Sequence, residues 1–239
     1  ERARSKYAPA PPFAMCGRYA LTIEPAILAG LFALESLFDF APRYNLAPTQ
    51  EAPVVTRPPG EERRATAMRW GLVPSWSKDA KIAGRTINAR SETAAEKPSF
   101  RAAFKRRRAL VPASWFYEWQ RDGKAKIPFR IQRADGAPLA LAGLFEHWMG
   151  SSTEAPRTTF TILTSSANED VVGLHDRMPC IVEPDDFDRW LDPEPRDDAA
   201  LARILAPAPA GTLGTDRVST RVNSVRNEGP TLVEPDTLF

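Results

Sequence analysis

The sequence predicts one α+β domain built on antiparallel strands. Segments with the composition of strands occur through the whole 239-residue chain, and short helical segments lie between them. No internal repeat and no flexible linker divides the chain. Hydrophobic residues make up 43% and charged residues 26%, which is ordinary for a globular protein and enough for a sizeable core.

The N-terminal half alternates short helices, strands and turn-rich loops. Glu24-Pro25 predicts the start of a short helix whose inner face carries Ile27, Leu28, Leu31 and Phe32. The Asn and Pro residues of segment 43–49 predict a loop. The remaining elements expected here are strands over 54–56 and 65–70, an aromatic loop over 71–77 and a helix over 99–107.

The C-terminal half is richer in strands. We expect strands over 109–112, 127–133, 139–148, 158–164 and 180–182, with a last one over 217–222. Asn168 is expected to cap a short helix that ends at Leu174, and further helices are expected over 185–191 and 197–205. Cys180 lies in one of the strands and is interpreted as a core residue.

Charge and cysteine content narrow the function classes. The net charge of +2 excludes a polycation, so a nucleic-acid partner would be held by a local basic patch. Two Cys and two His residues show no zinc-type spacing, so neither a metal nor another cofactor is expected. No apolar run is long enough to span a membrane. Residues 1–14 lack a signal-peptide core and are expected to be a disordered leader, an upstream translation start or a tag.

Cys16 follows Met15 and would become the first residue if the chain began at that Met and lost it. An N-terminal Cys carries an amine with a pKa of roughly 8 and a thiol with a pKa of roughly 8.5. The amine can form a Schiff base with an aldehyde, and the sulfur can then close a thiazolidine ring. Taken alone, however, Cys16 is equally compatible with a small buried core residue.

Glu118 is a carboxylate inside the aromatic run Trp115-Phe116-Tyr117-Glu118-Trp119. If it is buried, desolvation raises its pKa and suits it to acid/base chemistry. If the run alternates as an ordinary strand, Glu118 simply faces water. Both interpretations are open from the residues alone.

Eight motifs occur in an order that resembles one known family. They are MCGRYAL, RYNLAPTQ, MRWGLVPSW, INARSET, SWFYEW, LTSSAN, HDRMP and VNSVRNEGP. Together they resemble the SRAP family, the SOS response-associated peptidase domain, over 15–239. The resemblance implies a single α+β domain with a barrel-like β core. It also implies recognition of abasic sites in single-stranded DNA and covalent capture through an N-terminal Cys, with possible β-elimination.

The resemblance also implies roles for individual residues. Cys16 resembles the crosslinking residue, Asn88 the residue that orients it, Glu118 an acid/base, and His175 a group that assists Schiff-base chemistry. Arginines at three positions resemble phosphate-contacting or site-shaping residues, namely Arg18, Arg90 and Arg177. Five further residues resemble those that line the strand-binding groove in the family, namely Gly17, Asn45, Pro48, Trp76 and Thr164.

The leader departs from this pattern, because a peptide-linked Cys16 nitrogen is an amide and cannot form an imine. We therefore expect Met15 to be the functional start, or the leader to be removed. The alternative function is a thiol peptidase that uses Cys16, His175 and Glu118 or Asn88. A passive single-strand binder is a third reading. We expect a cytoplasmic monomer, associated with the nucleoid if it is bacterial, whose partner is single-stranded DNA with an abasic site.

Overall fold

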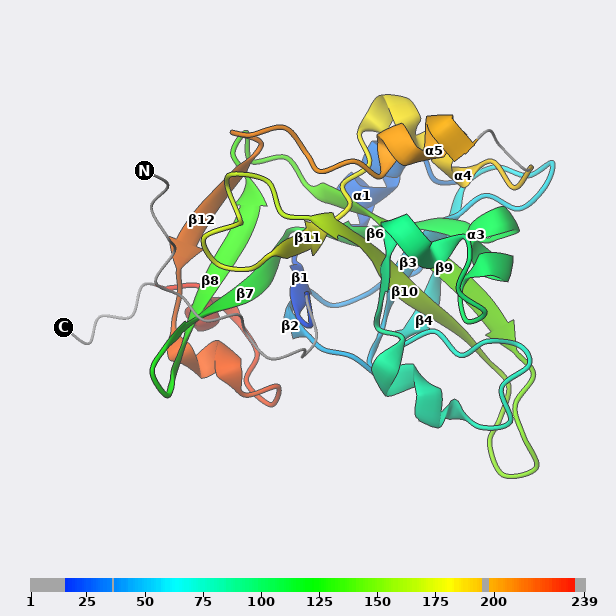
Figure 1. The fold of residues 1–239 in the computed structure, drawn as a ribbon, viewed down its shortest axis with the longest axis horizontal. Coiled ribbons are helices and arrows are strands. Elements are labelled where there is room, and N and C mark those ends of the chain that lie inside the picture. Colours follow the sequence, from blue (N-terminus) through cyan, green and yellow to red (C-terminus); the bar gives the residue numbers. More distant parts are fainter. Residues whose placement is uncertain (1–15, 36, 195–197, 235–239) are drawn as a thin grey trace, which may run out of the picture.

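The computed structural model describes residues 16–35, 37–194 and 198–234. The expected leader, residues 1–14, lies outside the described residues, as does Met15. The described chain forms a closed barrel with a second sheet beside it and short helices around them (Figure 1). The predicted α+β class and barrel-like core are confirmed.

Five strands close the barrel, in the order β10-β4-β3-β6-β9 and back to β10. These strands are β3 (Glu51–Thr56), β4 (Arg64–Trp70), β6 (Arg108–Ala113), β9 (Leu139–Trp148) and β10 (Arg157–Ser166). The contact between β4 and β10 is parallel, and the other four contacts are antiparallel. Within the barrel, the expectation of antiparallel pairing therefore holds except at this contact.

Small residues make so narrow a barrel possible. Ala140, Ala142 and Gly143 are part of β9, and Ala109 lies opposite Gly143 in β6. A Cβ atom on Gly143 would lie 2.9 Å from Cγ2 of Val111, closer than packed carbon atoms approach. The sequence of β9 therefore allows the strands to close around a core of buried hydrophobic side chains.

The second sheet has the order β12-β8-β7-β1-β2, and all its contacts are antiparallel. Its strands are β1 (Tyr19–Leu21), β2 (Arg43–Leu46), β7 (Trp115–Asp122), β8 (Ala125–Arg133) and β12 (Leu213–Arg217). Only Ser114 separates β6 of the barrel from β7 of this sheet. The two sheets therefore meet where β1 and β7 begin, with the second sheet on the left of Figure 1 and the barrel on the right.

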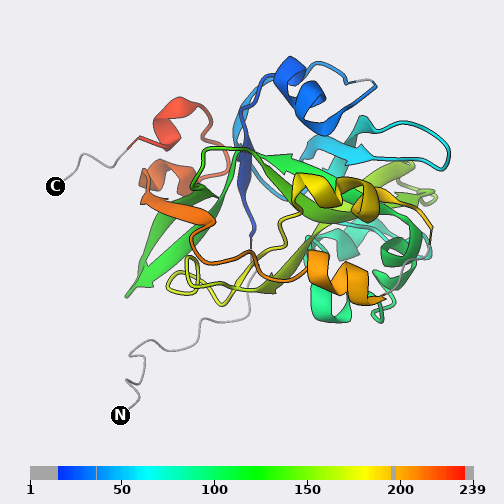
Figure 2. The same ribbon diagram turned by 90° about the horizontal axis from the view of Figure 1, so that it is seen from above.

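Two short strands extend β10 beyond the barrel. β5 (Asn88–Arg90) pairs with it in parallel, and β11 (Arg177–Pro179) pairs with it in antiparallel orientation. The α-helices are α1 (Pro25–Phe32), α2 (Ser91–Ala94), α3 (Arg101–Arg106), α4 (Phe187–Leu191) and α5 (Asp198–Ile204). Four 3₁₀ helices are η1 (Ala80–Arg85), η2 (Pro184–Asp186), η3 (Thr220–Asn223) and η4 (Pro230–Leu232). Figure 2 shows the helices placed around the sheets rather than between them.

None of the helices in the described part of the chain is both long and apolar enough to cross a membrane.

Five local expectations are wrong. Segment 180–182 is not a strand, because β11 ends at Pro179 and Ile181 forms an isolated bridge with Leu141. Segment 43–46 is strand β2, because its backbone pairs with β1. Segment 168–174 forms turns instead of a helix. The last strand is β12 at 213–217, and 220–223 is helical. On α1, Leu28 and Phe32 are buried, whereas Ile27 is 60% exposed and Leu31 is 39% exposed, so its buried face is narrower than predicted.

Gly71 fixes the loop that follows β4. Its φ of +116° favours glycine, and its N–H donates to the carbonyl of Phe160 at 2.8 Å. A Cβ atom at this position would lie 2.7 Å from the carbonyl oxygen of Ala83. Segment 71–85 can therefore pack directly against the end of β4.

Candidate active site around Cys16 and Glu118

The Cys16 backbone nitrogen donates a hydrogen bond of 2.8 Å to Oε1 of Glu118. The strand register explains this contact. β1 pairs with β7 so that Tyr19 lies opposite Phe116, and the N–H of Tyr117 donates to the carbonyl of Arg18 at 3.0 Å. Continuing that register toward the N-terminus brings the chain before β1 alongside Glu118. Of the predicted catalytic residues, Cys16 and Glu118 are thus in direct contact.

Glu118 is buried, with 4% of its surface exposed, so the interpretation that it faces water is wrong. Its pKa is raised from 4.5 to about 8, chiefly by burial and also by the charge of Asp176. Hydrogen bonds from the backbone of Cys16 and Trp119 favour the charged form and partly oppose this shift. The carboxyl group can therefore hold a proton near neutral pH and release it a little above.

The Cys16 thiol is also fully buried. Burial raises its pKa well above the ordinary value, and the nearby charge of Glu118 acts in the same direction. The sulfur is therefore kept as a thiol. Cys16 has a φ of +37°, which is unusual for a residue with a side chain and turns the chain sharply before β1.

His175 lies in the turn that leads into β11, and its ring is mostly buried. Nδ1 of the ring accepts the N–H of Arg177 at 3.0 Å and lies 2.9 Å from Oδ1 of Asp176. The first contact needs a lone pair on Nδ1, and the second needs a proton there. Burial lowers the pKa of His175, so the neutral ring that accepts from Arg177 is favoured at neutral pH. Since the Asp176 charge acts on Glu118, this turn adjoins the Glu118 site.

Arg177 is buried and serves as a clamp. Its guanidinium pairs with both carboxylate oxygens of Glu92, with one distance of 2.8 Å, and it also donates to the carbonyl of Thr164. Thr164 itself has no exposed surface. These contacts join α2, β10 and β11 behind the His175 turn. Arg177 and Thr164 therefore shape the site from within, and a direct DNA contact of either residue stays a prediction.

Strand β5 carries Asn88 and Arg90, which lie opposite Ile162 and the buried Thr164 of β10. Asn88 is half-buried, while Arg90 is exposed. Residues two apart on a strand share a face, so both side chains lie on the same side of β5. Arg90 is thus the predicted phosphate-contacting arginine with the most open position. The orienting role of Asn88 toward Cys16 stays a prediction.

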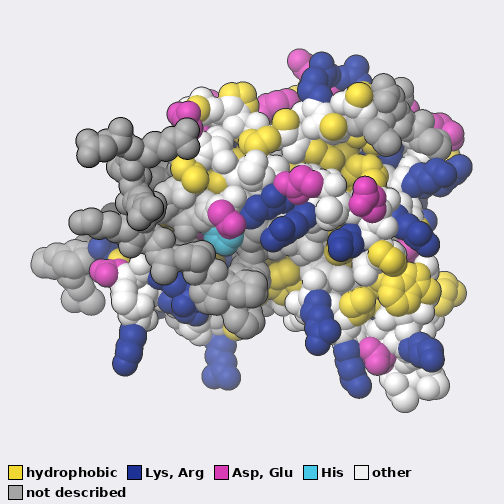
Figure 3. Space-filling view, viewed as in Figure 1, with side chains coloured by type: hydrophobic (Ala, Val, Ile, Leu, Met, Phe, Trp, Pro, Cys, Tyr) yellow, Lys and Arg dark blue, Asp and Glu magenta, His cyan; other side chains and the backbone are white. Residues whose placement is uncertain are grey.

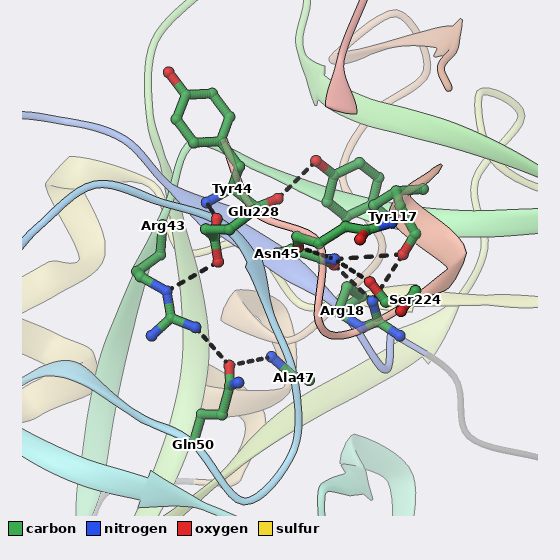
Figure 4. A network of polar contacts seen from close by, with 11 residues as sticks. Arg18, Arg43, Tyr44, Asn45, Ala47, Gln50, Tyr117, Ser224 and Glu228 are labelled. Atoms are coloured by element: carbon green, nitrogen blue, oxygen red, sulfur yellow. Dashed lines mark hydrogen bonds and ion pairs between the residues drawn. The ribbon is translucent and has the colours of Figure 1, made fainter. Parts of the chain in front are cut away.

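Asn45 and Arg18 belong to a network that fixes the C-terminal segment (Figure 4). Asn45 has no exposed surface, and its amide donates to the carbonyls of Ser224 and Asn227 at 3.0 and 2.9 Å. Arg18 donates to Oδ1 of Asn45 at 2.6 Å and to the carbonyl of Val222 at 3.0 Å. Both side chains are engaged in holding this segment against β1 and β2, so their DNA contact stays a prediction.

The same network continues to β7. The Tyr117 hydroxyl donates to the carbonyl of Tyr44 at 2.8 Å, and Nε1 of Trp119 donates to Oδ1 of Asn223 at 2.6 Å. Glu228 accepts from the backbone of Tyr44 and from Nε of Arg43. Segment 222–228 therefore braces strand β7, which carries Glu118, and the chain around β1, which follows Cys16.

The residues predicted to line a strand-binding groove have different surroundings. Trp76 is 60% exposed, which excludes a core role, and its indole N–H donates to the carbonyl of Pro98 at 3.4 Å. Gly17 and Pro48 are half-buried. Figure 3 shows Lys and Arg side chains around exposed hydrophobic ones on the face that it views. An exposed Trp is a suitable surface for stacking a base.

Three site residues were missed from the sequence. Asp176 acts on Glu118, Glu92 holds Arg177, and Glu228 holds the C-terminal segment. Each lies inside one of the eight motifs, so position in a motif was the available signal. Among residues 16–35, 37–194 and 198–234, no group of His, Cys, Asp and Glu side chains is arranged to hold a metal ion.

The chain is similar to known proteins in sequence. The model of the SOS response associated peptidase (SRAP) family matches residues 15–225. Abasic site processing protein YoqW of Bacillus subtilis (strain 168) is 39% identical over 92% of this chain and 99% of its own length. Abasic site processing protein HMCES of Gallus gallus is 34% identical over 92% of this chain and 78% of its length.

The solved structures share the fold. A protein structure from Bacteroides thetaiotaomicron has a TM-score of 0.83 at 24% identity and covers 92% of this chain and 99% of its own. One from Bordetella bronchiseptica has a TM-score of 0.73 at 28% identity and covers 85% and 100%. The motif order, the fold and the family match agree, and the chain belongs to the SOS response associated peptidase (SRAP) family.

Proposed function

We propose that this protein processes abasic sites in single-stranded DNA by covalent capture through Cys16 as the first residue of the mature chain. The relatives named abasic site processing proteins support the substrate. The observation that carries the chemistry is the 2.8 Å hydrogen bond between the Cys16 nitrogen and Glu118. In a chain that begins at Cys16, that nitrogen is the α-amine, and a buried acid/base then contacts the nucleophile directly.

The reaction proceeds in three steps. The amine lone pair attacks the aldehyde carbon of the opened abasic sugar, and a carbinolamine forms. A proton delivered to its hydroxyl releases water and leaves the imine. The thiol sulfur then adds to the imine carbon while its proton moves to the nitrogen, which closes the thiazolidine. The adduct is thus the sum of protein and DNA minus one water.

Glu118 is suited to both proton transfers. The pKa of an α-amine is roughly 8, and that of Glu118 is about 8 with Cys16 in peptide linkage. Two groups of matched pKa exchange a proton with little cost, so Glu118 can accept one from the ammonium and return it to the carbinolamine hydroxyl. In the mature form the two groups titrate as a coupled pair.

The Cys16 thiol supports this reaction better than a thiol peptidase. A peptidase needs a thiolate, whereas burial and Glu118 both keep this sulfur protonated. No hydrogen bond joins Cys16 to His175, although both lie in the described part of the chain. Sulfur attack on an imine comes second and can follow activation of the carbon, so a protonated thiol is compatible with ring closure.

We propose a later proton transfer for His175. Its ring contacts Asp176, and the charge of Asp176 acts on Glu118. Once Nδ1 is released from the Arg177 N–H, it can remove the proton on the carbon next to the imine carbon, and the 3′ phosphate is then expelled by β-elimination. We propose that this lyase route competes with thiazolidine closure at the same imine.

The test is a crosslinking assay on denaturing gels with single-stranded DNA that carries one abasic site. The form that begins at Cys16 is expected to give a heat-stable band without reductant. Cys16→Ser keeps the amine and is expected to give a band only after borohydride treatment. Acetylation of the Cys16 amine is expected to abolish both bands. A stable band from the acetylated protein would overturn the proposal and favour the thiol as the first nucleophile.

A further inference from the structure

A cavity of about 420 Å³ opens beside the barrel, away from the Cys16–Glu118 contact. It is lined by Thr49, Arg69, Val73, Ala80, Lys81, Ala83, Gly84, Glu154 and Arg157. Its walls come from the end of β4, the 3₁₀ helix η1 and the turn between β9 and β10. The last two segments lie next to each other at the lower right of Figure 1. Its size is within the range of pockets that hold small ligand groups.

The charges around this cavity do not balance. Three cations line it, Arg69, Lys81 and Arg157, against a single carboxylate, Glu154. Glu154 accepts the backbone N–H of Ala80 at 3.1 Å and lies 3.6 Å from Arg157. The carboxylate is therefore engaged with the wall of the cavity, and the site keeps a net positive charge.

Since Lys81 lies 3.9 Å from Asp79, Arg69 is the least engaged of these cations. Its side chain is half-buried and has no hydrogen bond or ion pair with any residue of the described ranges 16–35, 37–194 and 198–234. Arg157, in contrast, lies over the ring of Trp148 at 5.5 Å and faces Glu154. A guanidinium whose N–H groups have no other acceptor can donate two parallel hydrogen bonds to the oxygens of a phosphate group.

The cavity adjoins both loops that are expected to line the DNA strand. Thr49, in its wall, directly follows Pro48, and η1 begins four residues after Trp76. The indole N–H of Trp148 donates to the carbonyl of Ser77 at 2.8 Å, which ties the Trp76 loop to the β9 side of the cavity. A strand that passes Pro48 and Trp76 would therefore reach the basic opening.

We propose that this cavity binds a phosphodiester of the single strand, a few nucleotides away from the abasic site, with Arg69 as its main contact. The inference rests on the proposed function for the identity of the strand. Such a contact carries no sequence information, which suits a protein whose target lacks a base. It gives the strand a second point of attachment and fixes the direction in which it runs across the reaction site.

The test measures binding by fluorescence anisotropy with strands whose abasic sugar is reduced and therefore has no aldehyde. Binding of these strands does not depend on crosslinking, so failure of the capture chemistry and failure of this inference give different results. Arg69→Ala is expected to weaken binding of a long strand on the order of tenfold. It is also expected to make the plot of log affinity against log salt shallower by about 0.7, as loss of one phosphate contact requires.

Strand length and a control variant locate the contact. Arg203→Ala removes an exposed arginine from α5 and is expected to bind like the wild type. With strands shortened stepwise on either side of the lesion, the Arg69→Ala defect is expected to vanish once one particular side is too short. Arg69→Lys is expected to keep the salt slope and lose part of the affinity. An equal defect at every length, or wild-type binding by Arg69→Ala, would overturn the inference.

A free anion is distinguished by titration with inorganic phosphate. Phosphate is expected to compete with long strands and not with strands shortened on the critical side. Phosphate binding that Arg69→Ala abolishes without any effect on strand binding would assign the cavity to a free phosphate and overturn the DNA contact.

Discussion

Replacing Glu118 by Gln should change how the stability of the full chain depends on pH. In the folded protein the carboxyl pKa is about 8, whereas its ordinary value is 4.5. The unfolded chain therefore releases this proton as pH rises through 4.5, and the folded chain keeps it until about pH 8. Stability is fully present below pH 4.5 and falls as pH rises from 4.5 to 8. The Gln side chain has no charge to lose, so it removes this dependence.

The size of the effect follows from the difference of about 3.5 units between the folded and the ordinary pKa of Glu118, where each pKa unit corresponds to roughly 1.4 kcal/mol. Relative to its value below pH 4.5, the free energy of unfolding is therefore lower by about 5 kcal/mol above pH 8 and by about 3 kcal/mol at pH 7. The Gln amide brings two donors into a buried site and offsets part of the gain. We therefore expect Glu118→Gln to be more stable than the wild type at pH 7 by about 1–3 kcal/mol.

Urea unfolding at pH 5, 6, 7 and 8 measures this effect, and the slope with urea should stay the same. The matched control is Glu183→Gln, because its carboxyl is exposed in a surface ion pair with Arg133 and contributes little. In the form that begins at Cys16, the α-ammonium stabilises the charged carboxyl, so the pH dependence should shrink. Parallel curves for the wild type and Glu118→Gln would refute the reasoning.

The remaining predictions address the supports of the site. Asn45→Ala removes a fully buried amide and leaves the carbonyls of Ser224 and Asn227 without their donor, so it is expected to cost about 2 kcal/mol, seen as a melting temperature lower by roughly 4–8 °C. Gly71→Ala is expected to destabilise by about 2 kcal/mol or more in the same assay, since its φ is +116°. Arg177→Lys cannot keep both bonds to Glu92 and is expected to slow capture about tenfold in gel-based time courses while strand affinity stays within about twofold. In the form that begins at Cys16, the capture rate should follow a bell-shaped pH profile because the amine must lose a proton and Glu118 must hold one; Glu118→Gln should remove the falling limb.

Strand positions were well predicted where burial is nearly continuous, as in β9 and β10. The strand 43–46 was missed because its Arg, Tyr and Asn side chains resemble a loop composition, and pairing with β1 decides its conformation. The turns at 168–174 were mistaken for a helix because an Asn cap signal is local, whereas Asn168 instead binds the carbonyls of Ala208 and Pro209.

The sequence suggests which residues form the candidate site, but it does not give their geometry. The chemistry of an N-terminal Cys and of a buried Glu can be read from the residues, but their contact depends on the β1–β7 register. Motif membership did not separate exposed side chains such as Arg90 from buried braces such as Asn45. That distinction depends on segment 222–228, which is distant in sequence and covers Asn45 in the fold.

Intact mass spectrometry of two forms of the protein tests the central claim most directly. One form begins at Cys16, the other is the 239-residue chain, and each is incubated with single-stranded DNA that carries one abasic site. The account predicts that only the form beginning at Cys16 gains the mass of the DNA minus one water, without reductant. An equal gain by the full chain would contradict capture by the α-amine, and no gain by either form would contradict covalent capture itself.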